Sequence, residues 1–166
     1  MNLTVYHEFS DDLAGEWLDL LDKTNGRSPF LEFDYQKLWW ETKGGGEWPR
    51  ADLLLFAARM EGKLVGLAPL FSNPIPDGTV GLFNVGSIEV SDFLDVIVLP
   101  DYRDEFLTRL LGEIQALDLP GFSRLSLCNL LDSSPTLPAL KTAAVKTGWQ
   151  LTIEKLEHSP CITLAA

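Results

Sequence analysis

The sequence has few cysteines, no long apolar run and no signal-peptide pattern, and each of these scarcities excludes a class of function. Its 166 residues contain two cysteines, Cys128 and Cys161, and neither has a histidine or another cysteine nearby at the spacing of a zinc site. No apolar run is long enough to cross a bilayer, and no signal-peptide pattern opens the chain. We therefore expect buried free thiols, no metal site, no membrane partner and a cytoplasmic location.

Basic residues are also scarce. Lys and Arg number 13 and Asp and Glu number 24, which gives a formal net charge of −11. Binding to nucleic acid requires clustered cations, so we expect no nucleic-acid partner. The same charge disfavours an anionic membrane surface, and it is consistent with solubility or with a cationic or neutral partner.

The composition is that of an ordinary globular protein, and the spacing of apolar residues changes along the chain between that of strands and that of helices. Hydrophobic residues make up 46% and charged residues 22%, and the length suits one domain over residues 1–166. An antiparallel meander followed by alternating strands and helices predicts a mixed α/β sheet with helices on both faces. The predicted strands are residues 3–6, 52–60, 63–71, 79–86, 92–99, 123–130, 149–157 and 161–164, and the predicted helices are residues 11–24, 33–43, 103–117 and 135–147.

Several stretches, in this order, resemble one known family. They are "SPFLEFDYQKLWW", "AARMEGKLVGLAPLF", "SDFLDVIVLP", "LCNLLDSSPTLPAL" and "SPCITL". The set resembles the N-terminal half of CelD/BioF-like acetyltransferases of the Gcn5-related N-acetyltransferase (GNAT) superfamily, which are relatives of the bacterial FemAB-type aminoacyltransferases. The resemblance implies a GNAT-like fold, an acetyl-CoA-dependent N-acyltransferase family and a small-molecule amine acceptor. It also implies that this chain is one half of a tandem protein.

The cofactor turn of that family is altered here. In GNAT enzymes the acyl-CoA pyrophosphate usually binds after the fourth strand, at an Arg/Gln-x-x-Gly-x-Gly/Ala motif that opens a helix. The corresponding turn is Pro100, Asp101, Tyr102 and Arg103, and it contains no glycine. Proline lacks an N–H donor, and we expect Asp101 to cap the following helix. We therefore expect no cofactor in this chain and no activity from it alone.

Seven residues are candidates for an acceptor groove or polar site. A carboxylate inside an apolar strand needs a partner, although turn capping is an alternative explanation for acidic residues around residue 92. Aromatic residues near position 35 could line a groove or could belong to the core. Polar residues after the strand near residue 126 lie where α/β sheets often bind ligands, or they cap a helix. The candidates are Ser91, Asp92, Asp95, Phe30, Trp40, Asp132 and Ser133.

Three functions remain open from the sequence. The chain could be the half of an acyltransferase that shapes the acceptor site and packs on a catalytic, acyl-CoA-binding half. It could be a non-catalytic interaction module with a GNAT-like fold. It could also be a minimal, self-sufficient N-acetyltransferase with a diverged phosphate loop. The first two predict a protein partner, either a second GNAT-like domain or another copy of the chain, and none of the three identifies a general base.

Overall fold

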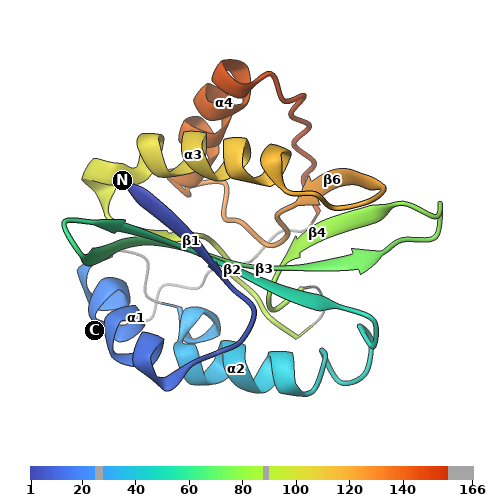
Figure 1. The fold of residues 1–166 in the computed structure, drawn as a ribbon, viewed down its shortest axis with the longest axis horizontal. Helices are drawn as coiled ribbons and strands as arrows, with labels where there is room; N and C mark the ends of the chain where they lie inside the picture. Colours follow the sequence, from blue (N-terminus) through green and yellow to red (C-terminus); the bar gives the residue numbers. More distant parts are fainter. Residues whose placement is uncertain (25–27, 88–89, 157–166) are drawn as a thin grey trace, which may run out of the picture.

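The computed structural model describes residues 1–24, 28–87 and 90–156, and it forms one sheet with helices on both faces (Figure 1). The predicted strand at residues 161–164 and Cys161 lie outside these ranges. The strands are β1 (Asn2–Tyr6), β2 (Asp52–Met60), β3 (Lys63–Pro74), β4 (Val80–Asn84), β5 (Ile97–Val98) and β6 (Phe122–Ser126). The helices are α1 (Asp11–Lys23), α2 (Phe33–Glu41), α3 (Arg103–Ala116) and α4 (Thr136–Thr147), with short 3-10 turns η1 (Pro29–Leu31) and η2 (Pro100–Tyr102).

The β2–β3 hairpin forms the centre of the sheet. Its strands are antiparallel neighbours, and their apolar residues are buried on both faces of the sheet. Leu53, Leu55 and Ala57 pack in the core beside α1 and α2, whereas Leu54 and Phe56 pack in the core beside α3 and α4. The nearly continuous apolar sequence of this hairpin is thereby explained, because both faces of a strand are covered.

The sheet is mixed, as the sequence predicts. Its strand order is β1-β2-β3-β4-β6, and among the strands of the described residues only the β4–β6 pair is parallel. Helices α1 and α2 cover the lower face in Figure 1, and α3 and α4 lie on the upper face. The mixed α/β fold with two helical layers is therefore confirmed.

Strand β4 is interrupted before it can complete the edge of β3. Both β4 and β5 pair with β3 in the same antiparallel sense, β4 at Leu70–Pro74 and β5 at Gly66 and Leu67. Residues 85–96 connect them, and we call this segment the excursion. The predicted continuous strand at residues 92–99 is therefore wrong over most of its length. Phe93 has a positive φ of 58°, and the Val96 N–H donates to the Asp95 side chain instead of a neighbouring strand.

The end of the described chain also differs from the prediction. Residues 149–156 were expected to form a strand, but they have no strand pairing within the described part of the chain. The helix before them is as predicted, because Gly148 ends α4 with a left-handed φ of 75°. A strand needs a hydrogen-bonded neighbour as well as a suitable sequence, and periodicity cannot supply that neighbour.

Candidate functional site

The candidate site lies where two parallel strands diverge. Strands β4 and β6 are paired from Val80 to Phe83 on the first and from Phe122 to Ser126 on the second. Beyond these residues, β4 continues into the excursion and β6 continues into residues 127–134. Ligands of α/β sheets bind in such crevices at the carboxyl ends of parallel strands. We call this region the fork.

Asn84 bridges the mouth of the fork. Its side-chain Nδ2 donates to the carbonyl of Cys128 at 3.0 Å, and the Cys128 N–H donates back to Asn84 Oδ1 at 3.0 Å. Ser87 Oγ donates to the same Oδ1 at 2.9 Å. The side-chain amide of Asn84, which is only 5% exposed, thus makes the two bonds that a neighbouring strand would make.

The excursion closes the next part of the fork. The Leu94 N–H donates to the Asn129 carbonyl at 3.0 Å, and Asn129 Nδ2 donates to the Ser91 carbonyl at 2.6 Å. Gly86 allows this approach, because a Cβ there would lie 2.9 Å from the Leu94 side chain, and its φ of 102° favours glycine. The fork is therefore occupied by the chain's own backbone groups.

Ser91 also contacts the opposite helical layer. The Tyr35 hydroxyl donates to the Val90 carbonyl at 2.9 Å and lies 2.7 Å from Ser91 Oγ. Because the phenol proton is used by Val90, the Ser91 hydroxyl donates to the phenol oxygen. The Tyr35 ring packs edge-on against Phe30, with ring centroids 5.3 Å apart. These contacts fix the excursion to the start of α2.

Both carboxylate oxygens of Asp95, the acidic residue inside the apolar stretch, accept hydrogen bonds. Asp95 Oδ1 accepts the Val96 N–H at 2.7 Å, and Oδ2 accepts the hydroxyl of Ser134. Ser134 Oγ in turn accepts the N–H of Thr136 at 3.1 Å, in the first turn of α4. The Ser134 side chain therefore links the excursion to the start of a helix, and Asp95 is a half-buried structural carboxylate in this arrangement.

The turn that precedes α3 has little capacity for an anion. The N–H groups of Tyr102 and Arg103 already donate to the carbonyls of Leu99 and Pro100. The expected cap by Asp101 is wrong: α3 begins at Arg103 after η2, and no side chain caps it. The 3-10 turn satisfies these donors through the backbone, so a side-chain cap is unnecessary.

One group in the turn does suit an anion. The Nε atom of Arg103 is buried and has no hydrogen-bond partner within the described residues. Asp101, Asp104 and Glu105 are exposed beside it, and Glu105 forms an ion pair with Arg109 at 3.0 Å. The N-terminal ammonium also lies 3.6 Å from Glu105, so the exposed carboxylates of Asp101 and Asp104 are the ones that oppose a phosphate at this turn.

Acetyl-CoA, which the family resemblance implies, does not fit the described residues of this turn and fork. A pyrophosphate needs open N–H donors at a helix N-terminus and a close backbone approach. The turn supplies a proline, used N–H groups and carboxylates in that place, and the fork is crossed by the Asn84–Cys128 and Leu94–Asn129 bonds. The chemistry of the turn and the closure of the fork are independent obstacles.

The remaining predicted residues lie outside this network or at its margin. Asp92 is exposed beside Ser91. Asp132 and Ser133 are exposed just before Ser134, and Asp132 lies 3.8 Å from Lys155. The structure thus brings Ser91 and Asp95 close to residues 127–134, the segment that carries Asp132 and Ser133.

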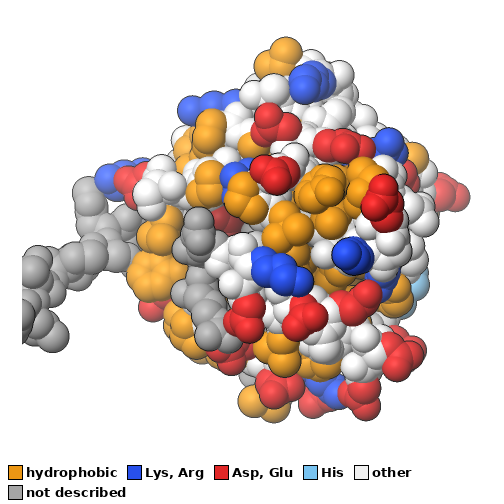
Figure 2. Space-filling view, turned by 90° about the vertical axis from the view of Figure 1, so that its left-hand side faces the viewer, with side chains coloured by type: hydrophobic (Ala, Val, Ile, Leu, Met, Phe, Trp, Pro, Cys, Tyr) orange, Lys and Arg blue, Asp and Glu red, His pale blue; other side chains and the backbone are white. Residues whose placement is uncertain are grey.

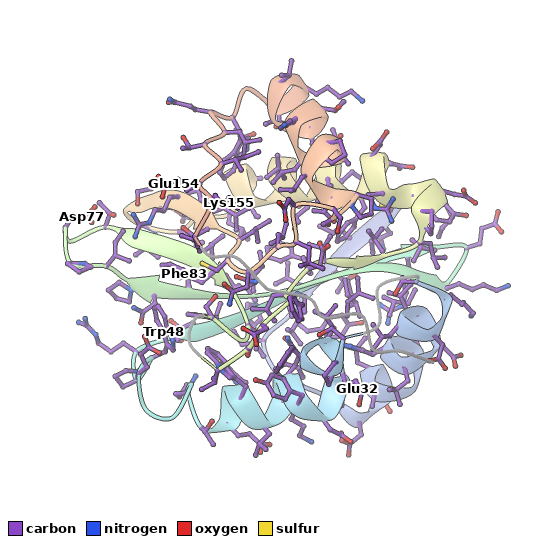
Figure 3. All side chains as sticks on the ribbon, turned by 180° about the vertical axis from the view of Figure 1, so that it is seen from behind. Glu32, Trp48, Asp77, Phe83, Glu154 and Lys155 are labelled. Atoms are coloured by element: carbon purple, nitrogen blue, oxygen red, sulfur yellow. The ribbon has the colours of Figure 1, made fainter. Side chains whose placement is uncertain are left out.

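Trp40 lies apart from the fork, in an aromatic cluster under the sheet. Phe71 contacts both Trp39 and Trp40, with ring centroids 5.5 and 6.2 Å away, and Trp48 packs on Phe83 at 5.1 Å (Figure 3). The Lys43 ammonium stands 3.0 Å above the Trp40 ring centroid. Desolvation lowers the pKa of Lys43, and nearby Asp52 opposes this shift.

Sequence reasoning missed the residues that hold the fork closed. They are Asn84, Asn129, Tyr35 and Ser134. An asparagine at the end of a strand and another at a position of positive φ are common in turns, so neither signals a bridge. Burial raises the pKa of the Cys128 thiol, which makes this side chain a poor nucleophile.

Comparison with known proteins assigns the fold but no closer relationship. No protein-family model matches the sequence, and no curated protein matches it. Among solved structures, the chain is similar to a ribosomal-protein-alanine N-acetyltransferase from Brucella melitensis biovar Abortus 2308, with 18% identity, a TM-score of 0.53, and 94% of this chain and 100% of that one covered. It is also similar to an aminoglycoside antibiotic 6′-N-acetyltransferase from Acinetobacter haemolyticus, with 16% identity, a TM-score of 0.51, and 98% and 100% coverage.

The chain therefore has the fold of the GNAT acetyltransferases. Both matched structures are covered over their full length, so the likeness extends to the whole arrangement of sheet and helices. In the described residues no helix is long and apolar enough to span a membrane. The same ranges contain no group of three or more His, Cys, Asp or Glu side chains that could hold a metal ion.

Proposed function

We propose that this chain is a CelD/FemAB-type acyltransferase domain that shapes part of an acceptor site and does not itself hold acetyl-CoA. In this proposal a second GNAT-like domain packs against it and supplies the acyl-CoA and much of the chemistry. The chain alone is inactive as a transferase. A bacterial, cytoplasmic setting accompanies the proposal, as the family resemblance implies.

The observation that carries the proposal is the chemistry of the turn before α3. Its fold position is that of a phosphate-binding turn, because a strand ends at Val98 and a long helix begins at Arg103. Its composition is unsuitable, because Pro100 has no N–H and the sequence next to Arg103 carries the carboxylates of Asp101, Asp104 and Glu105. A domain that keeps the fold and lacks the anion site is better suited to a supporting role than to catalysis.

The acceptor side of the proposal rests on the excursion. Ser91 and Asp95 are engaged in internal hydrogen bonds, whereas Asp92 is exposed next to Ser91. Phe93, which is 39% exposed, follows directly. A carboxylate beside an apolar side chain is suited to a cationic amine with an apolar substituent. We assign this exposed pair to the wall of the acceptor site.

An assay of thioester turnover tests the proposal. Purified chain is incubated with acetyl-CoA and a panel of primary amines, and release of free CoA thiol is followed with a thiol reagent. The proposal predicts release no faster than in buffer, and no change with Arg103→Ala. Amine-dependent release that depends on Arg103 would instead favour the self-sufficient enzyme with a diverged phosphate loop.

A second candidate function is a non-catalytic interaction module. The observation that favours it is a group of exposed apolar side chains around the end of α4, where Val145 is 84% exposed. Exposed apolar groups of this kind mark contact surfaces more often than catalytic ones. This surface includes a groove that is lined by apolar side chains and one lysine.

A further inference from the structure

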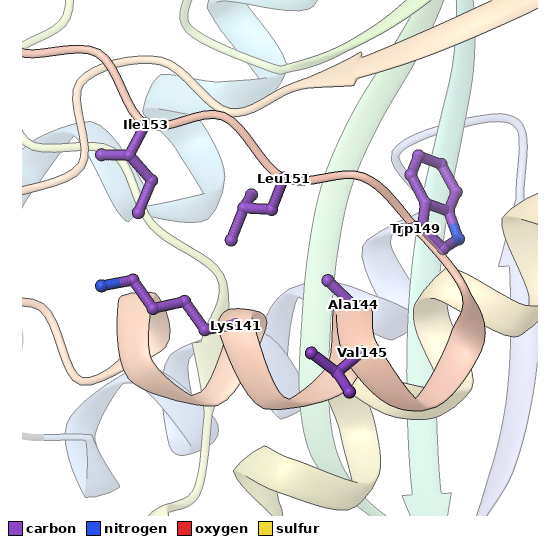
Figure 4. A pocket seen from close by; sticks show the side chains of 6 residues that line it. All are labelled: Lys141, Ala144, Val145, Trp149, Leu151 and Ile153. Carbon is purple, nitrogen blue, oxygen red and sulfur yellow. The ribbon is translucent and has the colours of Figure 1, made fainter.

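The surface in question is a groove between α4 and the extended chain that follows it (Figure 4). Its volume is about 430 Å³. We call it the α4 groove, and its lining residues are Lys141, Ala144, Val145, Trp149, Leu151 and Ile153. Five of these six side chains are apolar, and the cation lies at one end of the groove (Figure 4).

Apolar exposure concentrates here. Val145 is 84% exposed, more than any other large hydrophobic side chain of the described residues, and Ile153 is 51% exposed. Leu151 and Leu156 add exposed fractions of 36% and 62%. Four exposed large hydrophobic residues thus lie within residues 145–156, and an apolar partner could cover them together.

The extended chain beside the groove also has available backbone groups. No backbone hydrogen bond joins residues 150–156 to another part of the described chain, and the last one before them runs from the Trp149 N–H to the Ala144 carbonyl. The Nε1 donor of Trp149 is buried and without a partner among the described residues. An extended segment with unpaired N–H and C=O groups is a template for an added strand.

The chain segment that carries the groove has a net charge opposite to that of the preceding segment. Residues 119–156 carry four cations and two carboxylates, whereas residues 1–118 carry nine cations and 21 carboxylates. Figure 2 shows carboxylates spread over a face that includes α1, most densely in its lower part. Lys141 lines the groove, whereas Lys146 lines a separate hollow with Asp104 and Glu105. Lys155 lies near β6 above the sheet (Figure 3), 3.8 Å from Asp132.

We propose that the α4 groove binds an extended segment of a partner protein in which apolar and acidic side chains alternate. The segment adds a strand to residues 150–156, its apolar side chains cover Val145 and Ile153, and its carboxylates face the lysines. This inference stands independently of any acyltransferase role, because it rests on exposure, free backbone groups and local charge.

A fluorescent peptide of alternating glutamate and leucine, ELELELE, is the probe, and its anisotropy is followed with the full 166-residue chain. We expect saturable binding with a Kd of about 10–100 µM, since short strand additions are weak. The lysine analogue KLKLKLK should bind at least about tenfold more weakly, because the charge is then mismatched. The ELELELE peptide with N-methylated backbone amides should lose binding as well.

Variants locate the contact. Val145→Asp should abolish binding of the acidic peptide, and Lys141→Glu should weaken it by about tenfold. Leu38→Asp is the matched control: Leu38 is 61% exposed on α2, so its replacement should leave both binding and fold unchanged. Circular dichroism establishes that each variant is folded.

The proposal is overturned if ELELELE does not bind, if KLKLKLK binds equally well, or if Val145→Asp binds as the parent chain does. Concentration-dependent dimerisation in sedimentation that disappears in Val145→Asp would also overturn it, because the groove would then belong to a second copy. Failure here leaves the thioester assay unaffected, since residues 100–103, which that assay tests, do not line the α4 groove.

Discussion

The two segments of the β2–β3 hairpin are joined by backbone hydrogen bonds, whereas the two segments of the fork are joined mainly by side chains. In the hairpin, backbone groups pair from Asp52 to Met60 with a single register irregularity. In the fork, the backbone ladder between β4 and β6 ends after a few residues, and the side chain of Asn84 bonds both polar groups of Cys128. The hairpin would tolerate changes of apolar side chain that conserve volume, whereas the fork depends on particular amides and hydroxyls.

This difference has a functional consequence. A fork that is bridged by its own side chains offers fewer free backbone groups to an extended ligand, although parallel strands that diverge usually provide them. The predictions below test how strongly the fork depends on those side chains, in order of decreasing effect.

Removal of the bridging amide should have the largest effect. Asn84→Ala leaves the N–H and C=O of Cys128 without the side-chain partners they have in this half-buried place, while Ser87 keeps the Asn84 backbone carbonyl as its acceptor. We expect the free energy of unfolding to fall by about 3 kcal/mol, because unsatisfied buried groups cost more than a lost bond. Urea denaturation measures the change.

Asn73→Ala is the matched control for that substitution. Asn73 lies on β3, and its side chain donates only to the adjacent Pro74 carbonyl at 2.7 Å. We expect a loss below about 1 kcal/mol, since a local bond to an accessible group is readily replaced by water. Equal losses at the two asparagines would contradict the bridging role of Asn84.

The hairpin is most sensitive to added volume. A Cβ at Gly66 of β3 would lie 2.8 Å from the Phe106 ring, so Gly66→Ala should lower the free energy of unfolding by about 2 kcal/mol through overpacking. Gly112→Ala, on the open side of α3, should raise it by about 0.5 kcal/mol, because nothing lies within 4 Å and alanine favours a helix. Thermal melts of both variants compare the two; destabilisation at Gly112 would show that the packing account is wrong.

The link between the excursion and α4 should have an intermediate effect. Ser134→Ala removes the donor to Asp95 and the acceptor of the Thr136 N–H. We expect a loss of about 1.5 kcal/mol, typical of a helix-start hydroxyl with a second bond. In a double-mutant cycle with Asp95→Ala, the two changes should be non-additive by about 1 kcal/mol, and full additivity would separate the two residues.

Among the contacts of the fork, the smallest effect is expected at the contact with α2. Tyr35→Phe keeps the ring against Phe30 and removes the hydroxyl between Val90 and Ser91. We expect a loss of about 1 kcal/mol in chemical denaturation, because water can reach the Val90 carbonyl and only the buried Ser91 hydroxyl loses its partner. A loss as large as that of Asn84→Ala would contradict the view that Asn84 contributes most to the stability of the fork.

The sequence was most informative where the backbone does the bonding. The apolar periodicity of the hairpin, the stripe from Phe106 to Ile114 on α3 and the glycine stop at Gly148 predict their elements correctly. The strands expected at residues 92–99 and 149–157 are wrong in the described residues, because pairing partners and a positive φ at Phe93 are tertiary matters.

The candidate site could be predicted only in part. The need of Asp95 for a partner was evident from its apolar neighbours, yet the partner, Ser134, lies 39 positions further along the chain. Nothing local to Asn84 distinguishes a bridging amide from a turn asparagine. The absence of glycine in the turn before α3 was visible directly, because it depends on residue type alone.

The central claim is that this GNAT-fold domain does not hold acetyl-CoA. The most direct test is calorimetric titration of acetyl-CoA into the full chain at low salt, with a spectroscopic check that the domain is folded. The account predicts no saturable heat up to about 1 mM ligand, the range in which a non-covalent contact contributes little more than 4 kcal/mol. Saturable binding at micromolar acetyl-CoA that is lost in Arg103→Ala would contradict it.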